Sequence, residues 1–311
     1  MVSRVSYVLL VVIVTIGLGT AAFAAPYAIG DVFAAVGNGQ VAWFNSTGTL
    51  ISTLNDGQGG FTTGMAFNTA GDLFVTNFSA GSVSEFDNSG NLLNATFVTG
   101  ISSPEAIVFN SAGSMYVTSV GGTGITEYSP SGALLNTFIT GTRTDWMDLA
   151  SNQKTMYFTD ESGAIHVLDL PSNTQGADLI NGLGGGAALR ILPDGSILLA
   201  AEGAGIVDRV LPNGTVSQTY SLAGIGFPFA LNIDPDGTSF WTADPNGNIV
   251  RVDIATGAIL TSFNSGSNGS TFGLTVFGEK TVSTTPEPSS ILLMGTGFLG
   301  LAGVIRRKFR A

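Results

Sequence analysis

The side chains available for chemistry in this 311-residue sequence are mainly carboxylates, because it has no Cys and a single His, His166. Without Cys there can be no disulfide, thiolate metal site or Cys nucleophile. One imidazole also excludes a His-cluster zinc site and any mechanism that needs two imidazoles. Asp and Glu number 22 against 11 Lys and Arg. Any binding or metal site should therefore be built on acids.

The charge of the central part of the chain narrows the class of partner. Residues 25–285 hold six Lys or Arg against 21 Asp or Glu, which gives a net charge of −15. A general nucleic-acid binder needs a basic surface against the phosphates, so this class is excluded. The charge favours solubility, repels anionic surfaces and attracts divalent cations.

The elements that must position the acids come from an internal repeat of about 42 residues. An alternating strand recurs after six turns, which begin at Gly30, Gly71, Gly113, Lys154, Gly195 and Gly237. A second apolar strand follows about ten residues later, and turn formers such as Ser89-Gly90 and Ser131-Gly132 separate the units. Four short strands per repeat are typical of a propeller blade.

One extra strand sets the number of blades. A short apolar segment precedes every unit except the first, and one more copy occurs at 272–278, after the last complete unit. Gly278 lies 248 residues after Gly30, which is six repeats. The sequence therefore predicts an all-β, six-bladed β-propeller over residues 25–280. Its C-terminal inner strand, near residue 275, should close the ring beside residues near 33.

Two columns of the repeat offer ligand-binding side chains around one mouth of the central channel. Eight positions before the repeat starts lie Thr63, Glu105, Trp146, Ala187, Phe229 and Ser270, and the second strands end at Asn77, Ser119, Asp160, Glu202 and Asp244. With Asp145 and Asp148, these acids predict a calcium- or polyol-binding rim. Glu105, Trp146, Phe229 and Asn77 are its leading candidates, with the two aromatic rings as stacking surfaces. The alternative is that these Asp and Asn residues only cap strand ends.

Two other features carry less chemistry. His166 alternates with Ile165 and Val167, so we expect it to point toward solvent rather than to act in catalysis. The glycine-rich stretch at 182–186 has no helix after it to supply a dipole for a phosphate, and a loop between blades is expected there.

Segments 104–118 and 228–244 resemble NHL repeats and the wider superfamily of six-bladed propellers that includes SMP-30/gluconolactonase-type hydrolases. The resemblance implies a ligand over the central channel, and in the hydrolases a divalent metal held there by Glu, Asn and Asp from different blades. By this resemblance, a calcium-dependent hydrolase or lyase would use Glu105, Asp148, Asp160 and Asp244. The rim column, with two aromatic residues and one Ala, does not reproduce the hydrolase set.

The first 24 residues are typical of a secretory signal peptide. Arg4 supplies the positive charge, residues 8–18 the apolar region, and Ala22-Phe23-Ala24 the cleavage site. The alternative is an uncleaved anchor, for which the apolar run is short. We expect the mature chain to begin near Ala25.

The C-terminus combines three features in order. Pro286-Glu287-Pro288 is followed by an uncharged apolar stretch at 289–305 and then by Arg306, Arg307, Lys308 and Arg310. This tail, 286–311 after a linker at 281–285, resembles the PEP-CTERM sorting signal of Gram-negative bacteria. The resemblance implies an apolar helix in the inner membrane, recognition by an exosortase, and transfer to the cell surface or extracellular space. An ordinary tail anchor is the alternative.

Together these features predict an exported, exosortase-sorted propeller that acts as a binding module at the cell surface or in the extracellular matrix. An extracellular polysaccharide or a surface protein is the expected partner, no nucleic acid is expected, and no residue is assigned a catalytic role. The metal-dependent hydrolase or lyase, with Ca as its possible cofactor, and a purely structural matrix component are the alternatives.

Overall fold

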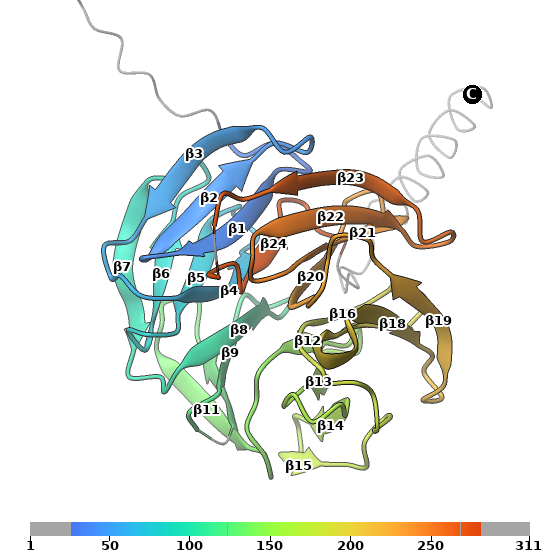
Figure 1. The fold of residues 1–311 in the computed structure, drawn as a ribbon. Coiled ribbons are helices and arrows are strands. Elements are labelled where there is room, and N and C mark those ends of the chain that lie inside the picture. Colours follow the sequence, from blue (N-terminus) through green and yellow to red (C-terminus); the bar gives the residue numbers. More distant parts are fainter. Residues whose placement is uncertain (1–25, 123, 268, 281–311) are drawn as a thin grey trace, which may run out of the picture.

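The computed structural model describes residues 26–122, 124–267 and 269–280, which form six four-stranded sheets around a central axis (Figure 1). The predicted all-β, six-bladed propeller is therefore confirmed. The expected signal peptide, linker and C-terminal helix lie outside the described residues. Within those residues, no helix has the length and apolar character needed to cross a membrane.

Each blade runs from an inner strand at the axis to an outer strand at the circumference (Figure 1). Blade 1 contains, in this order, β24 (Leu274–Val276), β1 (Val32–Gly37), β2 (Gln40–Phe44) and β3 (Leu50–Asn55). Blade 2 contains β4 (Thr62–Phe67), β5 (Leu73–Asn77), β6 (Ser82–Phe86) and β7 (Leu92–Thr99). Blade 3 contains β8 (Pro104–Phe109), β9 (Met115–Ser119), β10 (Gly124–Tyr128) and β11 (Leu134–Ile139).

The remaining three blades follow the same order. Blade 4 contains β12 (Met147–Leu149), β13 (Thr155–Phe158), β14 (His166–Asp169) and β15 (Thr174–Gln175). Blade 5 contains β16 (Leu189–Ile191), β17 (Ile197–Ala201), β18 (Ile206–Val210) and β19 (Val216–Ser221), with the short 3-10 helix η1 (Glu202–Ala204) after β17. Blade 6 contains β20 (Ala230–Ile233), β21 (Ser239–Ala243), β22 (Asn248–Asp253) and β23 (Ile259–Asn264).

The ring closes through the extra strand that the repeat predicted. Antiparallel pairing joins β24 to β1, with Phe33 opposite Thr275 and the flanking residues paired in register. Because β24 comes from the end of the described chain and β1 from its beginning, blade 1 ties the two ends together. Closure leaves no open edge between the first and last blades.

The blades pack through apolar faces on both sides. All five residues of β5 and of β17 are buried, as expected for strands covered on two faces. The outer strands are mostly exposed and each keeps few buried side chains, such as Leu54 in β3 and Phe138 in β11. The core therefore lies between neighbouring blades, and its density decreases toward the circumference.

A buried threonine on the second strand, or directly after it, joins each of three blades to the next blade. Its hydroxyl donates a hydrogen bond to a backbone carbonyl of the neighbouring inner-strand segment, at 2.6–3.0 Å, in the pairs Thr76–Glu105, Thr118–Asp145 and Thr159–Ala187. Blade 5 has Ala200 in this column, and there the backbone NH of Ala188 bonds to the carbonyl of Phe229 instead. These bonds fix the height of one inner strand relative to the next.

We expect Thr118→Val to lower the free energy of unfolding by about 1–3 kcal/mol, because a buried NH and a buried carbonyl lose their partner. The Thr118 hydroxyl accepts from the backbone NH of Ala106 at 2.8 Å and donates to the carbonyl of Asp145. Chemical unfolding measures the change. The exposed Thr137→Val is the matched control, and equal effects of the two substitutions would contradict this account.

Candidate functional site

The two ends of the inner strands open onto two different surfaces of the propeller. Strand β8 illustrates this, since Glu105 stands at its start and Phe109 at its end. Four carboxylates gather near the first end, from blades 3 to 5. We call Glu105, Asp145, Glu161 and Glu202, with Arg143 among them, the acidic mouth.

Local structure explains how these acids converge. Glu105 and Asp145 enter or precede inner strands, whereas Glu161 and Glu202 follow second strands, so both columns end on the same side. Arg143 Nε lies 2.9 Å from Asp145 Oδ1, and its terminal nitrogen lies 2.6 Å from Glu161 Oε2. One guanidinium thus faces four carboxyl groups. The predicted acidic rim is present here for Glu105, Asp145 and Glu202.

Burial and like charge raise the pKa values of three of these acids. The pKa of Glu105 is raised well above its ordinary value, first by burial and then by the charges of Asp145 and Glu161. Burial and the charges of Glu161 and Asp145 raise the pKa of Glu202 to about 7. The pKa of Asp145 rises to about 6 because its burial outweighs the pairing with Arg143. At neutral pH the mouth therefore offers both hydrogen-bond donors and acceptors.

Two polar atoms in this region have no hydrogen-bond partner among the described residues. They are Nε1 of Trp146 and Oε2 of Glu202, both of which are buried. Burying such a group without a partner costs about 1–3 kcal/mol, so natural structures satisfy it with water or a ligand. These atoms are the strongest sign of a binding function in the mouth.

Aromatic rings line the neighbouring part of the same surface. Trp146 contacts Phe229 at 6.0 Å, and Phe229 contacts Phe272 at 5.3 Å, between ring centroids. Trp146 and Phe229, expected to be open stacking surfaces, are 2% and 7% exposed. Both rings are packed into an apolar cluster that several blades share. The exposed rings are Phe61 and Phe227, which contact Phe272 and Phe229 respectively.

Asn77 does not reach the mouth surface. It is fully buried at the end of β5, and its amide nitrogen lies 3.3 Å from the hydroxyls of Ser82 and Ser84. This position supports the turn between β5 and β6, as the strand-capping alternative proposed.

The four acids of the alternative metal site lie in different surroundings. Asp160 accepts a hydrogen bond from Thr142 at 2.7 Å, and Asp244 accepts two from Asn248, backbone and side chain, at 3.0 and 2.9 Å. Asp148 points toward the opposite end of the channel from Glu105, as described below. In the described part of the chain, no group of three or more His, Asp or Glu side chains could hold a metal ion.

The position of His166 corrects the expectation that it points toward solvent. The ring is 7% exposed, with Nδ1 2.7 Å from Asp178 Oδ1 and Nε2 3.2 Å from Asp160 Oδ2. Alternation did place it on the face opposite Ile165, but the segment around Asp178 covers that face. The bridge between Ile165 and Ile180 holds this covering segment in place.

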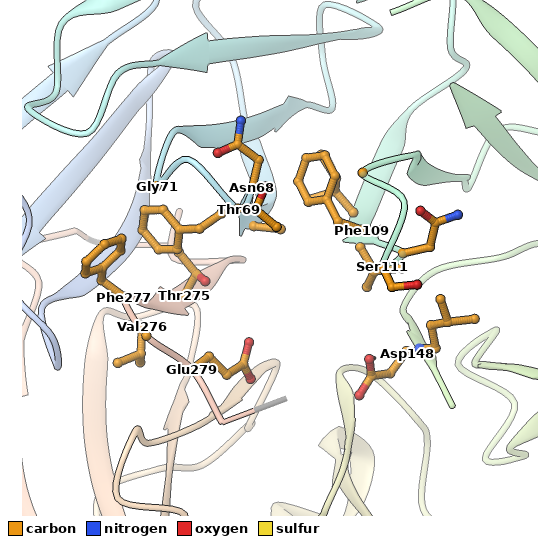
Figure 2. Close-up of a pocket in the computed structure, with 18 of the residues that line it drawn as sticks. Asn68, Thr69, Gly71, Phe109, Ser111, Asp148, Thr275, Val276, Phe277 and Glu279 are labelled. Carbon is orange, nitrogen blue, oxygen red and sulfur yellow. Dashed lines mark hydrogen bonds between the residues drawn. The ribbon is translucent and has the colours of Figure 1, made fainter. Parts of the chain in front are cut away.

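A pocket of about 590 Å³ occupies the other end of the inner strands (Figure 2). Turns of blades 2 and 3, around Asn68 and Ser111, line one part of it, and the segment Thr275–Glu279 lines another. Asp148 also lines it, and it accepts backbone NH groups of Leu149 and Ile191 at 2.9 and 2.8 Å. Burial raises the pKa of Asp148 to about 6, although Arg190 opposes this.

One ion pair at this pocket anchors the closing segment. Arg190 Nε lies 2.9 Å from Glu279 Oε1, which also accepts the backbone NH of Ile233 at 2.8 Å. Glu279 follows β24, so this contact links blade 1 to blades 5 and 6. Sequence reasoning missed the pair, because Arg190 and Glu279 are far apart in the chain and only ring closure brings them together.

Comparison with known proteins separates the tail from the propeller. Residues 284–308 match the PEP-CTERM protein-sorting motif. Among curated proteins, none matches the sequence. The expected processing residues Pro286, Glu287, Pro288, Arg306 and Arg307 lie in the matched segment but outside the described residues, as do Ala22 and Ala24 of the expected cleavage site.

Solved structures with a similar fold have low sequence identity. A chain in the crystal structure of a nidogen/laminin complex has a TM-score of 0.67 at 16% identity, covering 80% of this chain and 98% of its own. A streptogramin B lyase has a TM-score of 0.53 at 19% identity, and the match covers 65% of this chain and 68% of that lyase. A catalytically inactive virginiamycin B lyase from Staphylococcus aureus, solved with quinupristin, has a TM-score of 0.56 at 14% identity. The match covers 78% of this chain and 87% of that lyase. These likenesses show the fold alone.

The raised pKa of Glu202 gives a stability change with a defined sign. Between about pH 4.5 and 7 the folded protein keeps this proton while the unfolded chain loses it, so stability present below pH 4.5 is lost as the pH rises through about 7. We expect Glu202→Gln to reduce this loss of stability. The midpoint of thermal unfolding of the variant should therefore fall less steeply as the pH rises from about 4.5 to 7. Asp87→Asn is the control, because the pKa of Asp87 is lowered and its effect falls at lower pH. An unchanged slope in Glu202→Gln would refute the assignment.

Removing the anchor of the closing segment should destabilise the ring. We expect Glu279→Ala to lower the free energy of unfolding by about 3 kcal/mol, because it leaves the buried Arg190 guanidinium without its partner. Glu279→Gln, which keeps an acceptor for the NH of Ile233, should cost less. Chemical unfolding of both variants measures the difference, and a neutral Glu279→Ala would show that β24 closes the ring without this pair.

Proposed function

We propose that this chain, an exported protein carrying the PEP-CTERM protein-sorting motif at residues 284–308, is a binding module of the cell surface or extracellular matrix. The motif implies processing by exosortase after a transient stay in the membrane. We infer a Gram-negative host, in which the inner membrane holds the tail before processing. The propeller supplies the ligand-binding part.

The acidic mouth is the proposed binding site, and the observation that carries it is the pair of unpartnered buried atoms. Trp146 Nε1 can only donate a hydrogen bond, whereas Glu202 Oε2 can accept one when ionised. A ligand with hydroxyl groups can do both with one kind of group. The exposed rings of Phe61 and Phe227 lie nearby and offer apolar faces for stacking.

The charge of the mouth selects among hydroxylated ligands. Four carboxyl groups face one Arg, so uronic acids and other anions are repelled. Glu202, whose pKa is raised to about 7, can donate to neutral hydroxyls when protonated and accept from them when ionised. A neutral glycan of the extracellular matrix therefore fits better than an acidic one.

The fold neighbours support more than one use of this scaffold. One belongs to a complex of two proteins and another was solved with quinupristin bound to a lyase. The alternative, a metal-dependent hydrolase or lyase, would need Glu105, Asp148, Asp160 and Asp244 to converge, whereas Asp148 lines the pocket at the other end of the channel and no group of three acids in the described residues could hold a metal ion. Calorimetric titration with calcium separates the two, since the binding module needs no tight calcium site.

The binding proposal is tested by titrating neutral and uronic-acid oligosaccharides into the exported protein. We expect saturable binding of a neutral oligosaccharide, weakened about tenfold by Trp146→Phe, which removes only the indole donor, or by Glu105→Ala. Glu127→Ala is the matched control, because Glu127 lies in the same blade and bonds to Tyr116 instead. Unchanged binding by both mouth variants, or binding of acidic oligosaccharides alone, would exclude the mouth as the site.

A further inference from the structure

The inner strand of every blade pairs with one strand only, so its other edge faces the central channel (Figure 1). In an antiparallel pair, residues bonded to the partner strand alternate with residues whose NH and carbonyl groups point away from it. The residue directly after each inner strand donates its NH to the partner arm: Asn68, Asn110, Ala150, Leu192, Asp234 and Phe277. The last residue of each inner strand therefore directs its NH toward the channel: Phe67, Phe109, Leu149, Ile191, Ile233 and Val276.

Three of these six NH groups bind carboxylates of the protein itself. Asp148 accepts the NH groups of Leu149 and Ile191 at 2.9 and 2.8 Å. Glu279 accepts the NH of Ile233 at 2.8 Å. All three NH groups belong to blades 4 to 6, so one half of the channel at this level presents carboxylates in place of open donors.

The other three NH groups, in blades 1 to 3, have no such acceptor. Among the described residues, no side chain or carbonyl oxygen across the channel accepts the NH of Val276, Phe67 or Phe109. All three residues line the pocket of about 590 Å³. Backbone NH groups in such positions are nearly always bound by water or a ligand when no protein acceptor is near. This half of the pocket therefore offers open hydrogen-bond donors.

The two halves together define the polar group that fits between them. A molecule in the pocket meets backbone donors on the side of blades 1 to 3 and the carboxyl groups of Asp148 and Glu279 on the other side. An amide group carries a carbonyl oxygen for the donors and an NH for the carboxylates. It can thus bond to both halves at once.

Charge disfavours an anionic group at the same place. The pocket already contains Asp148 and Glu279, and one cation, Arg190, whose Nε lies 2.9 Å from Glu279 Oε1. A ligand carboxylate on the open NH groups would be a third acid facing a single guanidinium. A neutral carbonyl oxygen accepts the same hydrogen bonds without this repulsion.

The remaining lining favours an apolar body on the ligand. The half-buried side chains of Phe67, Phe109 and Phe277 line the pocket, and the rings of Phe67 and Phe277 contact each other at 4.9 Å between centroids. Figure 2 shows the rings of Phe109 and Phe277 around the same space as the carboxylates of Asp148 and Glu279. Apolar walls with a few placed polar groups, at volumes of about 300–1,000 Å³, are typical of small-molecule sites.

We propose that this pocket binds a small neutral molecule that carries an amide group on an apolar body. The amide oxygen accepts from open NH groups of blades 1 to 3, the amide NH donates to the carboxylates of the opposite half, and the aromatic side chains contact the body. This site lies at the other end of the channel from the acidic mouth and does not depend on the function proposed for the mouth.

Titration of phenylacetamide into the isotope-labelled protein, followed by NMR of the backbone amides, tests the proposal. Phenylacetate is the matched ligand, because it replaces the amide by a carboxylate of nearly the same shape. We expect saturable shifts with phenylacetamide at a Kd of about 1 mM or lower, and at least about tenfold weaker binding of phenylacetate.

The channel supplies its own internal control for this titration. The largest shifts should fall among the amide resonances of Val276, Phe67 and Phe109. The amides of blades 4 to 6 that already have carboxylate acceptors should move less. Shifts that avoid the pocket, equal binding of phenylacetate, or no saturable binding of phenylacetamide would each overturn the proposal.

A variant that fills the pocket locates the site independently. Ala66 lines the pocket, so we expect Ala66→Leu to weaken phenylacetamide binding about tenfold or more by occupying part of the space. Ala255→Leu makes the same substitution at an exposed turn of blade 6 and should leave binding unchanged. Thermal unfolding and the NMR spectrum verify that both variants fold. Unchanged binding by a folded Ala66→Leu would show that the ligand binds elsewhere.

Discussion

The pairing of β24 with β1 is the contact on which the rest of the structure depends. Each blade buries its faces only against its neighbours, so an open array would leave two faces exposed to water. Closure by a strand from the far end of the chain removes both faces at once. Glu279, just after that strand, then reaches Arg190 and the backbone of Ile233 in two other blades. The closed ring also gathers acids from three blades at one mouth.

The sequence predicted the ring in detail because hydrophobic periodicity and turn residues depend on local geometry. The six repeat starts and the extra strand at 272–278 indicated the blade number and the pairing partner, and both are confirmed. The positions of individual site residues were harder to predict. Asp148 was placed with the rim acids because it lies two residues after Trp146. It stands in the middle of β12 and lines the pocket at the other end of the channel.

Burial by neighbouring blades limited the rest of the site prediction. Trp146, Phe229 and His166 were assigned to the correct strands or strand ends, but segments from elsewhere in the chain cover them. A repeat pattern cannot show which loop lies over a given position, because that depends on packing between blades. The acids Glu105 and Glu202 were found in the repeat columns, whereas the contribution of Glu161 depends on the loop after β13. Their shared charge and burial make this mouth costly to fold, which is common where a surface serves binding.

The direction in which the chain leaves the propeller has a consequence for its presentation. Lys280, the last described residue, directly follows Glu279, which lines the pocket, so the described chain ends at the end of the axis opposite the acidic mouth. Under the proposed function, any attachment made through the residues after Lys280 would leave the acidic mouth on the side of the propeller away from the point of attachment.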